Sequence, residues 1–502
     1  MKRPVFIAVL LAGALLLCAS AGWAQQQQGQ TQTSGQQNQQ GATGQSGTAP
    51  PTTVTPTPPG QNSTQQGETV QSQTSNSASG TAATTPPLTG AEQYTLSRMG
   101  AGHSYVIPSL QFAQSVSTYG TGAFGTSTVD SVSTLSGSLD LNYLWGKYAF
   151  SARYDGTGFV YNQQSQYNNS AHLLTLSQRV MGRRSLFLFS DAVSYLPEAS
   201  FGYSRFNGTG SNIYSYGGLF GSGISNIDTS FLPSQSILTG SSSRVSNSVV
   251  GQYDYLLSPL STLTLTGAYS LLRFPSSDYF DSDDIIAQLG YNRSLTAKNS
   301  MAVSYQASFF RYSQGLGNFT DHVVEITFRR ALSNRMGVQI GAGPQANIFS
   351  NGASGQDAKF GWAMNSELTY SFRRYQFAAS YHHYTNGGSG VYQGATTDYV
   401  DADVGTPLSH MWTLNVDLGY ARNSNLQQNS SNNTRVYNAW YGTVNLQRLL
   451  NRWMTMFLSY NLQQQLAPAF TCVGSTCGTF YTQQYFSFGL NWHPSRMSEE
   501  AY

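Results

Sequence analysis

Few residues in this chain of 502 have the type and spacing to do chemistry. The densest group is a set of four carboxylates in one expected outer loop: Asp278, Asp281, Asp283 and Asp284. Carboxylate oxygens at this density can bind Ca²⁺, but the spacing matches no calcium-binding loop, and the glycine of a tight cage is missing. A solvated acidic rim is therefore the favoured interpretation, with a calcium site as the alternative.

The histidines do not combine into a site. His382 and His383 are adjacent in a strand-like segment, so their imidazoles point to opposite faces and cannot hold one metal ion together. None of the 7 histidines lies in a recognisable catalytic motif. We therefore predict no enzyme active site, no metal centre and no cofactor.

Cysteine usage indicates an oxidising compartment. Cys18 lies in an N-terminal leader, which leaves Cys472 and Cys477 close together in a polar stretch. We predict a disulfide between these two residues, within a loop. A metal site is weakly supported, because no histidine or further cysteine lies nearby to complete it.

Composition indicates the kind of scaffold that carries these residues. Charged residues make up only 10% of the chain, while it contains 32 Tyr, 26 Phe and 50 Gly. Beyond the N-terminus, no apolar run reaches the roughly 20 residues that a membrane helix needs. Low charge and many aromatics without a spanning helix favour a transmembrane β-barrel, in which alternation dilutes the apolar residues. The net charge of +2 is spread along the chain and argues against a nucleic-acid partner.

The N-terminal part divides into a leader and a polar tract. Residues 1–24 have the basic start, apolar core and small residues of a secretory signal peptide, with cleavage after Ala24. A lipoprotein signal ending at Cys18 is disfavoured, because Leu17 stands where that pattern has a small residue. Residues 25–95 are rich in Gln, Ser, Thr and Pro and should be disordered, as a periplasmic extension. The extension is either a neutral tail, which we favour, or a tether to the cell wall.

Residues 96–502 show the strand pattern of an all-β domain. Segments of about ten alternating residues are joined in pairs by short turns, which predicts a transmembrane antiparallel barrel of about 18 strands (16–18). The expected strands are 104–116, 135–145, 148–153, 172–180, 185–195, 246–256, 262–273, 285–293, 301–311, 322–330, 336–347, 360–372, 375–384, 398–404, 411–421, 435–447, 453–464 and 481–492. A soluble sandwich or propeller is the rival, but its water-facing residues would carry more Lys and Glu.

Alternation also sorts the two faces of each strand. Val324, Ile326 and Phe328 should face lipid, while Glu325 and Thr327 face the lumen. The same parity assigns to the lumen a mixed set of charges: Asp140, Arg153, Arg179, Asp254, Glu325, Arg329, Glu367 and Asp417. A mixed lining predicts weak ion selectivity, and pairing of these charges across strands is the alternative role.

Aromatic residues gather beside the short turns, where a barrel meets the membrane interface. They are Tyr143, Trp145, Tyr148, Tyr255, Tyr370, Phe372, Trp412, Trp453 and Trp492. The turns beside them should therefore face the periplasm, and the longer connections should face outward.

The last strand-like segment has one aromatic face, formed by Phe486, Phe488, Leu490 and Trp492. It resembles the C-terminal assembly signal of bacterial outer-membrane β-barrels, although a tail from His493 to Tyr502 follows it. The resemblance implies the cell outer membrane, insertion by the barrel-assembly machinery, and contact with outer-membrane lipid and lipopolysaccharide.

The longest outward segment runs from about Leu196 to Arg244 and is third among the outer connections. In this order, and in strand number, the chain resembles general porins, whose third outer loop narrows the pore. The resemblance implies a constriction loop with candidates Glu198, Tyr203, Arg205, Phe206 and Asp228, and a homotrimer. Its many aromatics and few charges suit uncharged polar solutes such as sugars; a loop packed outside the mouth is the alternative.

Together these features predict a porin-like outer-membrane channel for passive passage of small polar solutes. A non-conducting surface or anchoring protein, which binds partners through its outer loops, is the second hypothesis. An outer-membrane hydrolase is the third, and it would require a close His–Ser or His–Asp pair at the rim.

Overall fold

The structure is a computed structural model of the chain. It describes residues 104–121, 128–163, 168–196, 237, 243–275, 279–313, 317–333, 335–350, 358–372, 375–426, 436–466, 481–492 and 497–498. All described residues belong to one compact unit, which lies within Thr57–Tyr502. The signal peptide expected at 1–24 and the disordered tract expected at 25–95 lie outside the described residues and stay predictions.

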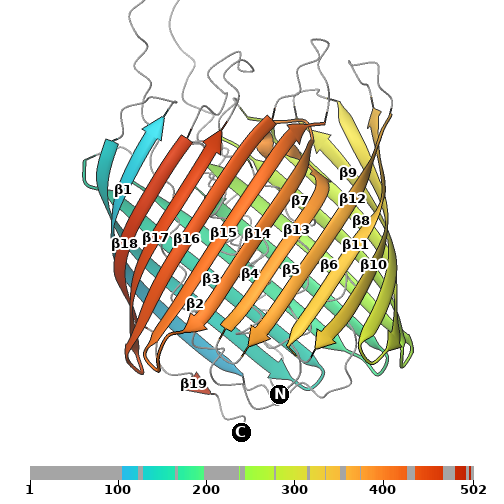
Figure 1. The fold of residues 1–502 in the computed structure, drawn as a ribbon, viewed down its shortest axis with the longest axis horizontal. Helices are drawn as coiled ribbons and strands as arrows, with labels where there is room; N and C mark the ends of the chain where they lie inside the picture. The colour runs from blue at the N-terminus through green and yellow to red at the C-terminus, as the bar shows by residue number, and fades with distance from the viewer. Residues whose placement is uncertain are drawn as a thin grey trace, which may run out of the picture. The chain divides into compact units, whose positions relative to one another are not determined.

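Eighteen long strands form a closed antiparallel β-barrel, as predicted (Figure 1). The first nine are β1 (Tyr105–Thr121), β2 (Thr128–Trp145), β3 (Tyr148–Tyr161), β4 (Asn169–Met181), β5 (Ser185–Leu196), β6 (Arg244–Ser258), β7 (Ser261–Arg273), β8 (Ser282–Thr296) and β9 (Asn299–Tyr312). The others are β10 (Asn318–Ser333), β11 (Met336–Ser350), β12 (Ala358–Phe372), β13 (Tyr375–Asn386), β14 (Ala395–Pro407), β15 (Trp412–Asn425), β16 (Val436–Asn451), β17 (Met454–Leu466) and β18 (Tyr481–Trp492). Each strand pairs with its neighbours in sequence, so the barrel has an up-and-down order.

The first and last long strands close the ring. Val116 of β1 lies opposite Phe486 of β18, and Leu110 lies opposite Trp492. Beyond β18, the two-residue strand β19 (Met497–Ser498) also pairs with β1. Closure gives every strand two partners, which removes the unpaired edges that a bilayer does not tolerate.

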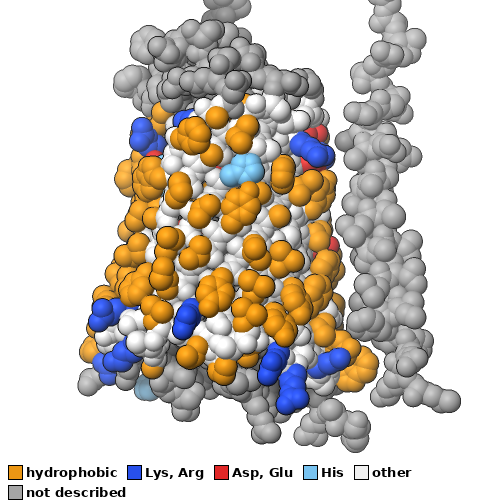
Figure 2. All heavy atoms as spheres, turned by 90° about the vertical axis from the view of Figure 1, so that its right-hand side faces the viewer, with side chains coloured by type: hydrophobic (Ala, Val, Ile, Leu, Met, Phe, Trp, Pro, Cys, Tyr) orange, Lys and Arg blue, Asp and Glu red, His pale blue; other side chains and the backbone are white. Residues whose placement is uncertain are grey.

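The period-two sequence pattern becomes an apolar outside and a polar inside. In β8, the exposed row contains Ile285, Leu289 and Tyr291, and the buried row between them contains Gln288 and Asn292. Figure 2 shows hydrophobic side chains spread over the middle of one outer face, with Lys and Arg near both of its ends. The apolar outside therefore suits lipid, and the interior keeps the hydrogen-bonding groups.

Aromatic and cationic side chains lie close together at the short-turn ends of the strands, where the sequence predicted aromatic residues. Trp145 packs against Tyr148 across the tight turn at Gly146, with 5.5 Å between ring centroids. The guanidinium of Arg335 lies 5.2 Å from the Phe372 ring centroid, and that of Arg448 lies 5.3 Å from the Trp412 ring centroid. Rings of this kind with nearby cations suit the boundary between hydrocarbon and headgroups.

No helix within the described residues is long and apolar enough to cross a membrane.

Candidate functional site

The interior of the barrel holds a connected polar surface. On β16 and β17, Thr443 donates a 2.7 Å hydrogen bond to the Asn461 side chain. Across the closing seam, the hydroxyls of Ser115 and Ser487 lie 2.8 Å apart. Such uncharged hydrogen-bonding groups can replace part of the water shell of a polar solute, which an apolar lining cannot do.

The first group of interior charges lies on β2, β3 and β4. Asp140 lies opposite Arg153 in the register of β2 and β3. Arg153 forms two hydrogen bonds with Asp155, Nε–Oδ2 at 2.8 Å and Nη2–Oδ1 at 3.1 Å. Arg179 on β4 is also in the buried row, 5% exposed. The structure therefore places Asp140, Arg153 and Arg179 in one part of the wall, where Arg153 has a carboxylate partner.

Asp254 on β6 is fully enclosed, with 0% of its surface exposed. It accepts hydrogen bonds from Thr264 Oγ1 at 2.6 Å and from Gln252 Nε2 at 2.8 Å. These two neutral donors stabilise a carboxylate that water does not reach.

A second group of charges lies on β10 to β15. Glu325 Oε1 accepts hydrogen bonds from Thr327 and from Asn365, both at 2.7 Å. Glu367 interacts electrostatically with Arg329 on one side and with Asp401 and Asp403 on the other. Asp417 lies opposite Asp403 in the register of β14 and β15.

Asp401 and Asp403 were missed in the sequence, although the signal was present. They alternate with Val400, Ala402 and Val404, the same parity rule that identified Glu325 and Glu367. Asp155 was missed for a different reason, because the expected strand ended too early, at 153 rather than Tyr161. Applying the parity rule throughout 398–404 would have found Asp401 and Asp403, and extending the strand beyond 153 would have found Asp155.

The connection between β13 and β14 folds inward against the ends of β7 to β10. Residues 387–394, which we call the strap, contain a short 3-10 helix, η4 (Gly388–Gly390). Gly388, Gly390 and Gly394 have φ of 79°, 76° and 86°, which favours glycine over any other residue. Such a backbone can turn tightly and approach its neighbours closely.

The strap is held by hydrogen bonds from the ends of β8 and β9, several strands away in the ring, and from the end of the adjacent β15. The Tyr312 hydroxyl donates to the Gly387 carbonyl at 3.2 Å, and Phe280 N donates to the Gly390 carbonyl at 2.9 Å. Leu426 N, just beyond β15, donates to the Gly394 carbonyl at 3.1 Å. Since β13 and β9 are separated by three strands, these contacts show that the strap folds inward over part of the mouth at the long-connection end of the barrel.

Aromatic side chains at the ends of neighbouring strands pack beside the strap. Phe310, Tyr312, Phe319, Phe349 and Leu426 form one buried cluster, with 4.5 Å between the Phe310 and Phe319 ring centroids. A side chain at Gly390 would lie 2.2 Å from the Phe274 ring, and one at Gly394 would lie 2.6 Å from the Phe319 ring. The glycines are therefore needed for contact as well as for conformation.

One described residue of the long β5–β6 connection also lies inside the barrel. Ile237 is 1% exposed and packs with Tyr392 of the strap, with Ala395 of β14 and with Tyr437 of β16. The constriction candidates Glu198, Tyr203, Arg205, Phe206 and Asp228 lie outside the described residues, as do Cys472 and Cys477. The constriction loop and the disulfide stay predictions.

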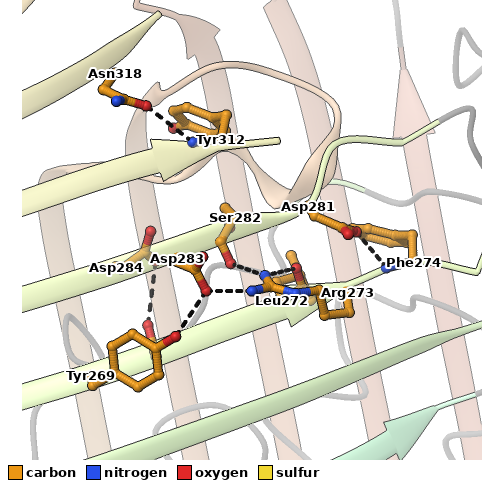
Figure 3. A network of polar contacts seen from close by, with 11 residues as sticks. Tyr269, Leu272, Arg273, Phe274, Asp281, Ser282, Asp283, Asp284, Tyr312 and Asn318 are labelled. Carbon is orange, nitrogen blue, oxygen red and sulfur yellow. Dashed lines mark hydrogen bonds and ion pairs between the residues drawn. The ribbon is translucent and has the colours of Figure 1, made fainter. Parts of the chain in front are cut away.

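In the acidic stretch near β8, Asp281, Asp283 and Asp284 do not converge on one point (Figure 3), and Asp278 lies outside the described residues. Asp283 and Asp284 belong to β8 rather than to a loop, and alternation sends them to opposite faces. Asp283 binds Arg273 on the outer face at 2.5 Å, while Asp284 accepts a 3.3 Å bond from Ser270 inside. Asp281 accepts from the Phe274 backbone at 2.8 Å. No group of three or more possible metal ligands occurs among the described residues.

The histidines are also separated. His383 Nδ1 lies 2.6 Å from Asp398 Oδ1 on the outer face, and its ring stacks on Trp362 with centroids 4.2 Å apart. His172 contacts Ser170 Oγ at 3.1 Å and the Tyr154 hydroxyl at 2.9 Å. A serine hydrolase needs a hydroxyl and an orienting carboxylate or amide on the same imidazole. Neither His383 nor His172 has both in these contacts.

A closed barrel of 18 strands with an apolar outside, a polar interior and an inward-folded outer segment defines a porin-like outer-membrane β-barrel. No protein-family model matches the chain, and no curated protein sequence matches it.

Three bacterial proteins are among the solved structures to which the chain is similar. OpdQ of Pseudomonas aeruginosa is 10% identical, with a TM-score of 0.41 over 78% of this chain and 98% of that chain. OccK2 (OpdF) of the same organism, solved in complex with glucuronate, is 8% identical, with a TM-score of 0.41 over 78% and 98%. OccAB4 of Acinetobacter baumannii is 8% identical, with a TM-score of 0.38 over 78% and 99%. Because these values are low, we infer function from the chain's own interior.

Proposed function

We propose that the chain is a passive outer-membrane channel for small polar solutes, narrowed at its outer mouth by the strap, residues 387–394. The observation that carries this proposal is the polar interior of a closed barrel. A barrel with this number of strands is wide enough to hold a water-filled bore unless chain fills it. Amide and hydroxyl groups along the wall would let hydrated solutes pass without a large desolvation penalty.

The orientation follows from the ends of the strands. The short turns with their aromatic girdle face the periplasm, and the strap faces the cell exterior. The predicted N-terminal tract, residues 25–95, would then lie in the periplasm.

Polar pairs on the outer face, such as Tyr305–His322 and Tyr381–Asp398, would lie near lipid headgroups and lipopolysaccharide. Insertion by the barrel-assembly machinery and a homotrimeric state are further proposals, supported by the resemblances of β18 and of the strand number.

The strap supports a size limit at the mouth. It brings backbone and aromatic side chains from β13–β14 to the side of β7–β10, so a solute must pass beside it. A limit set by packed backbone depends on solute width more than on solute chemistry.

A second candidate is a non-conducting surface or anchoring protein. Enclosure of most interior side chains favours it, as illustrated by Asn445 at 0% and Gln463 at 1% exposure. If the interior is filled all the way through, the outer connections would carry the function by binding partners.

Swelling of liposomes that contain the refolded protein distinguishes the two candidates. Vesicles placed in iso-osmotic solutions of neutral sugars of increasing size should swell with the small sugars and not with the large ones. Vesicles without protein give the background rate. Background rates for every sugar, from protein that is folded by its heat-modifiable migration on a gel, would favour the non-conducting candidate.

A further inference from the structure

The interior wall is not equally accessible around the ring. On β2 to β9 and on β16 to β18, which we call the enclosed wall, most of the inward side chains are buried, as illustrated by Asp254 and Ser487 at 0% exposure. On β12 to β15, most of the inward side chains are half-buried instead: Asn365, Glu367, Thr369, Ala378, Ser380, His382, Tyr399, Asp403, Thr413, Asn415 and Asp417. Solvent therefore reaches the interior mainly along β12 to β15, which we call the open wall.

The charges on the open wall have mostly one sign. Glu367, Asp401, Asp403 and Asp417 face inward toward the short-turn ends of β12, β14 and β15. Lys359 is the inward cation on the described part of these strands, and it lies at the opposite, outer end of β12. Arg329 on β10 lies beyond Gln339 in the same register row as Glu367, so it balances part of this charge from the side.

Two contacts show how densely the carboxylates are placed. Asp403 and Asp417 are direct cross-strand partners, an arrangement in which like charges repel. Asp401 accepts a hydrogen bond from Ser380, whose strand partner on the other side is Glu367. A mobile cation beside this row would reduce the repulsion, whereas an anion would increase it.

The enclosed part of the wall has a different charge pattern. Arg153 pairs with Asp155 there, and Arg179 and Arg244 accompany Asp140 and Asp254. Asp284 on β8 is a further buried carboxylate of this wall. Charges of both signs therefore line the enclosed wall and offset part of each other's field along the path of a solute.

We propose that solutes pass along the open wall and that Glu367, Asp401, Asp403 and Asp417 make this path selective for small cations over anions. This inference rests on the proposed channel function and adds the charge class of the solute. It also replaces the weak selectivity expected from a mixed lining, because the mixed charges lie mainly on the enclosed wall.

The test is the reversal potential of the refolded protein in a planar bilayer with a KCl gradient. The unmodified protein should give a potential on the K⁺-selective side. Combined Asp403→Asn and Asp417→Asn substitutions should move this potential toward zero, because they remove the opposed pair. Ser380→Lys is an independent variant that adds a cation to the same row and should shift the potential in the same direction.

Asp254→Asn is the matched control. It removes the same charge from an inward position near a short turn, but on the enclosed wall, so the potential should not change. A potential near zero in the unmodified protein, or an equal shift in Asp254→Asn, would overturn the inference and leave the channel function standing. A bilayer that carries no current, with protein that is folded on a gel, would overturn the channel function itself.

Discussion

Gly343 illustrates the residue scale, because one missing side chain allows two strands to meet. A Cβ atom there would lie 1.7 Å from the backbone oxygen of Val324 on β10. The next residue, Pro344, has no N–H and cannot donate to the ladder at this point. Glycine and proline together therefore permit a close approach where the regular pairing is interrupted.

We predict that Gly343→Ala destabilises the barrel by roughly 1–3 kcal/mol, the usual range for overpacking. Urea titration of the refolded protein in lipid vesicles measures the change in unfolding free energy. Gly251→Ala is the control, because nothing lies within 4 Å of a Cβ atom at that strand position. Equal stability of the two variants would contradict the account of Gly343.

At this scale, much of the candidate site could be read from the sequence. The inward orientation of Glu325 and Glu367 could be predicted, because a carboxylate that faces lipid is unfavourable. The burial of Asp254 and the partial exposure of Asp417 could not be predicted from the sequence. Alternation shows on which face of a strand a side chain lies, but not what covers that face. The pairing of Arg153 with Asp155 needed the correct strand end.

The strap is the element with the most direct effect on the channel. We predict that Gly390→Val displaces it, since the new side chain meets Phe274 and the residue would keep a φ of 76°. Single-channel recordings should show a larger and noisier conductance. Gly361→Val is a matched interior control, because the nearest atom to a Cβ there, Gln345 Oε1, is 3.9 Å away. Conductance equal to that of the control would count against a constricting strap.

The closing strand β18 allows a test of membrane depth. We predict that Phe488→Lys, in the middle of the lipid-facing row, costs about 2–4 kcal/mol of stability, the range for lysine at the bilayer midplane. Gln484→Lys lies on the same face near the outer end, where the penalty should fall to about 0–1 kcal/mol. The fraction of folded protein at increasing urea concentration measures the stability of both variants. Equal penalties would contradict a bilayer midplane at Phe488 and an interface near Gln484.

Strands could be predicted from sequence because each has its own period-two pattern, as the expected segments 262–273 and 481–492 show. The position of the strap could not be predicted from the sequence. Its glycines between Gly387 and Gly394 were visible, but its position depends on Tyr312, Phe274 and Phe319, which are remote in sequence and have no pattern that links them to the strap. Asp283 and Asp284 were wrongly assigned to a loop, because β8 begins at Ser282, before both of them.

For the whole molecule, the interior divides into an enclosed wall with charges of both signs and an open wall that is mostly acidic. Closure of the ring between β1 and β18 makes this division possible, because it brings strands from both ends of the chain around one interior. An acidic open wall predicts that increasing ionic strength weakens the K⁺ preference, as counter-ions screen the carboxylates. Reversal potentials at a constant KCl ratio and increasing total concentration measure this, and an unchanged preference would contradict the electrostatic origin.

The central claim is that the barrel conducts, and single-channel recording of the unmodified, refolded protein in a planar bilayer tests it most directly. The account predicts discrete, stable current steps whose size rises with KCl concentration. A bilayer that stays silent, while the same preparation shows the heat-modifiable band of a folded barrel, would contradict the claim and favour a surface or anchoring protein.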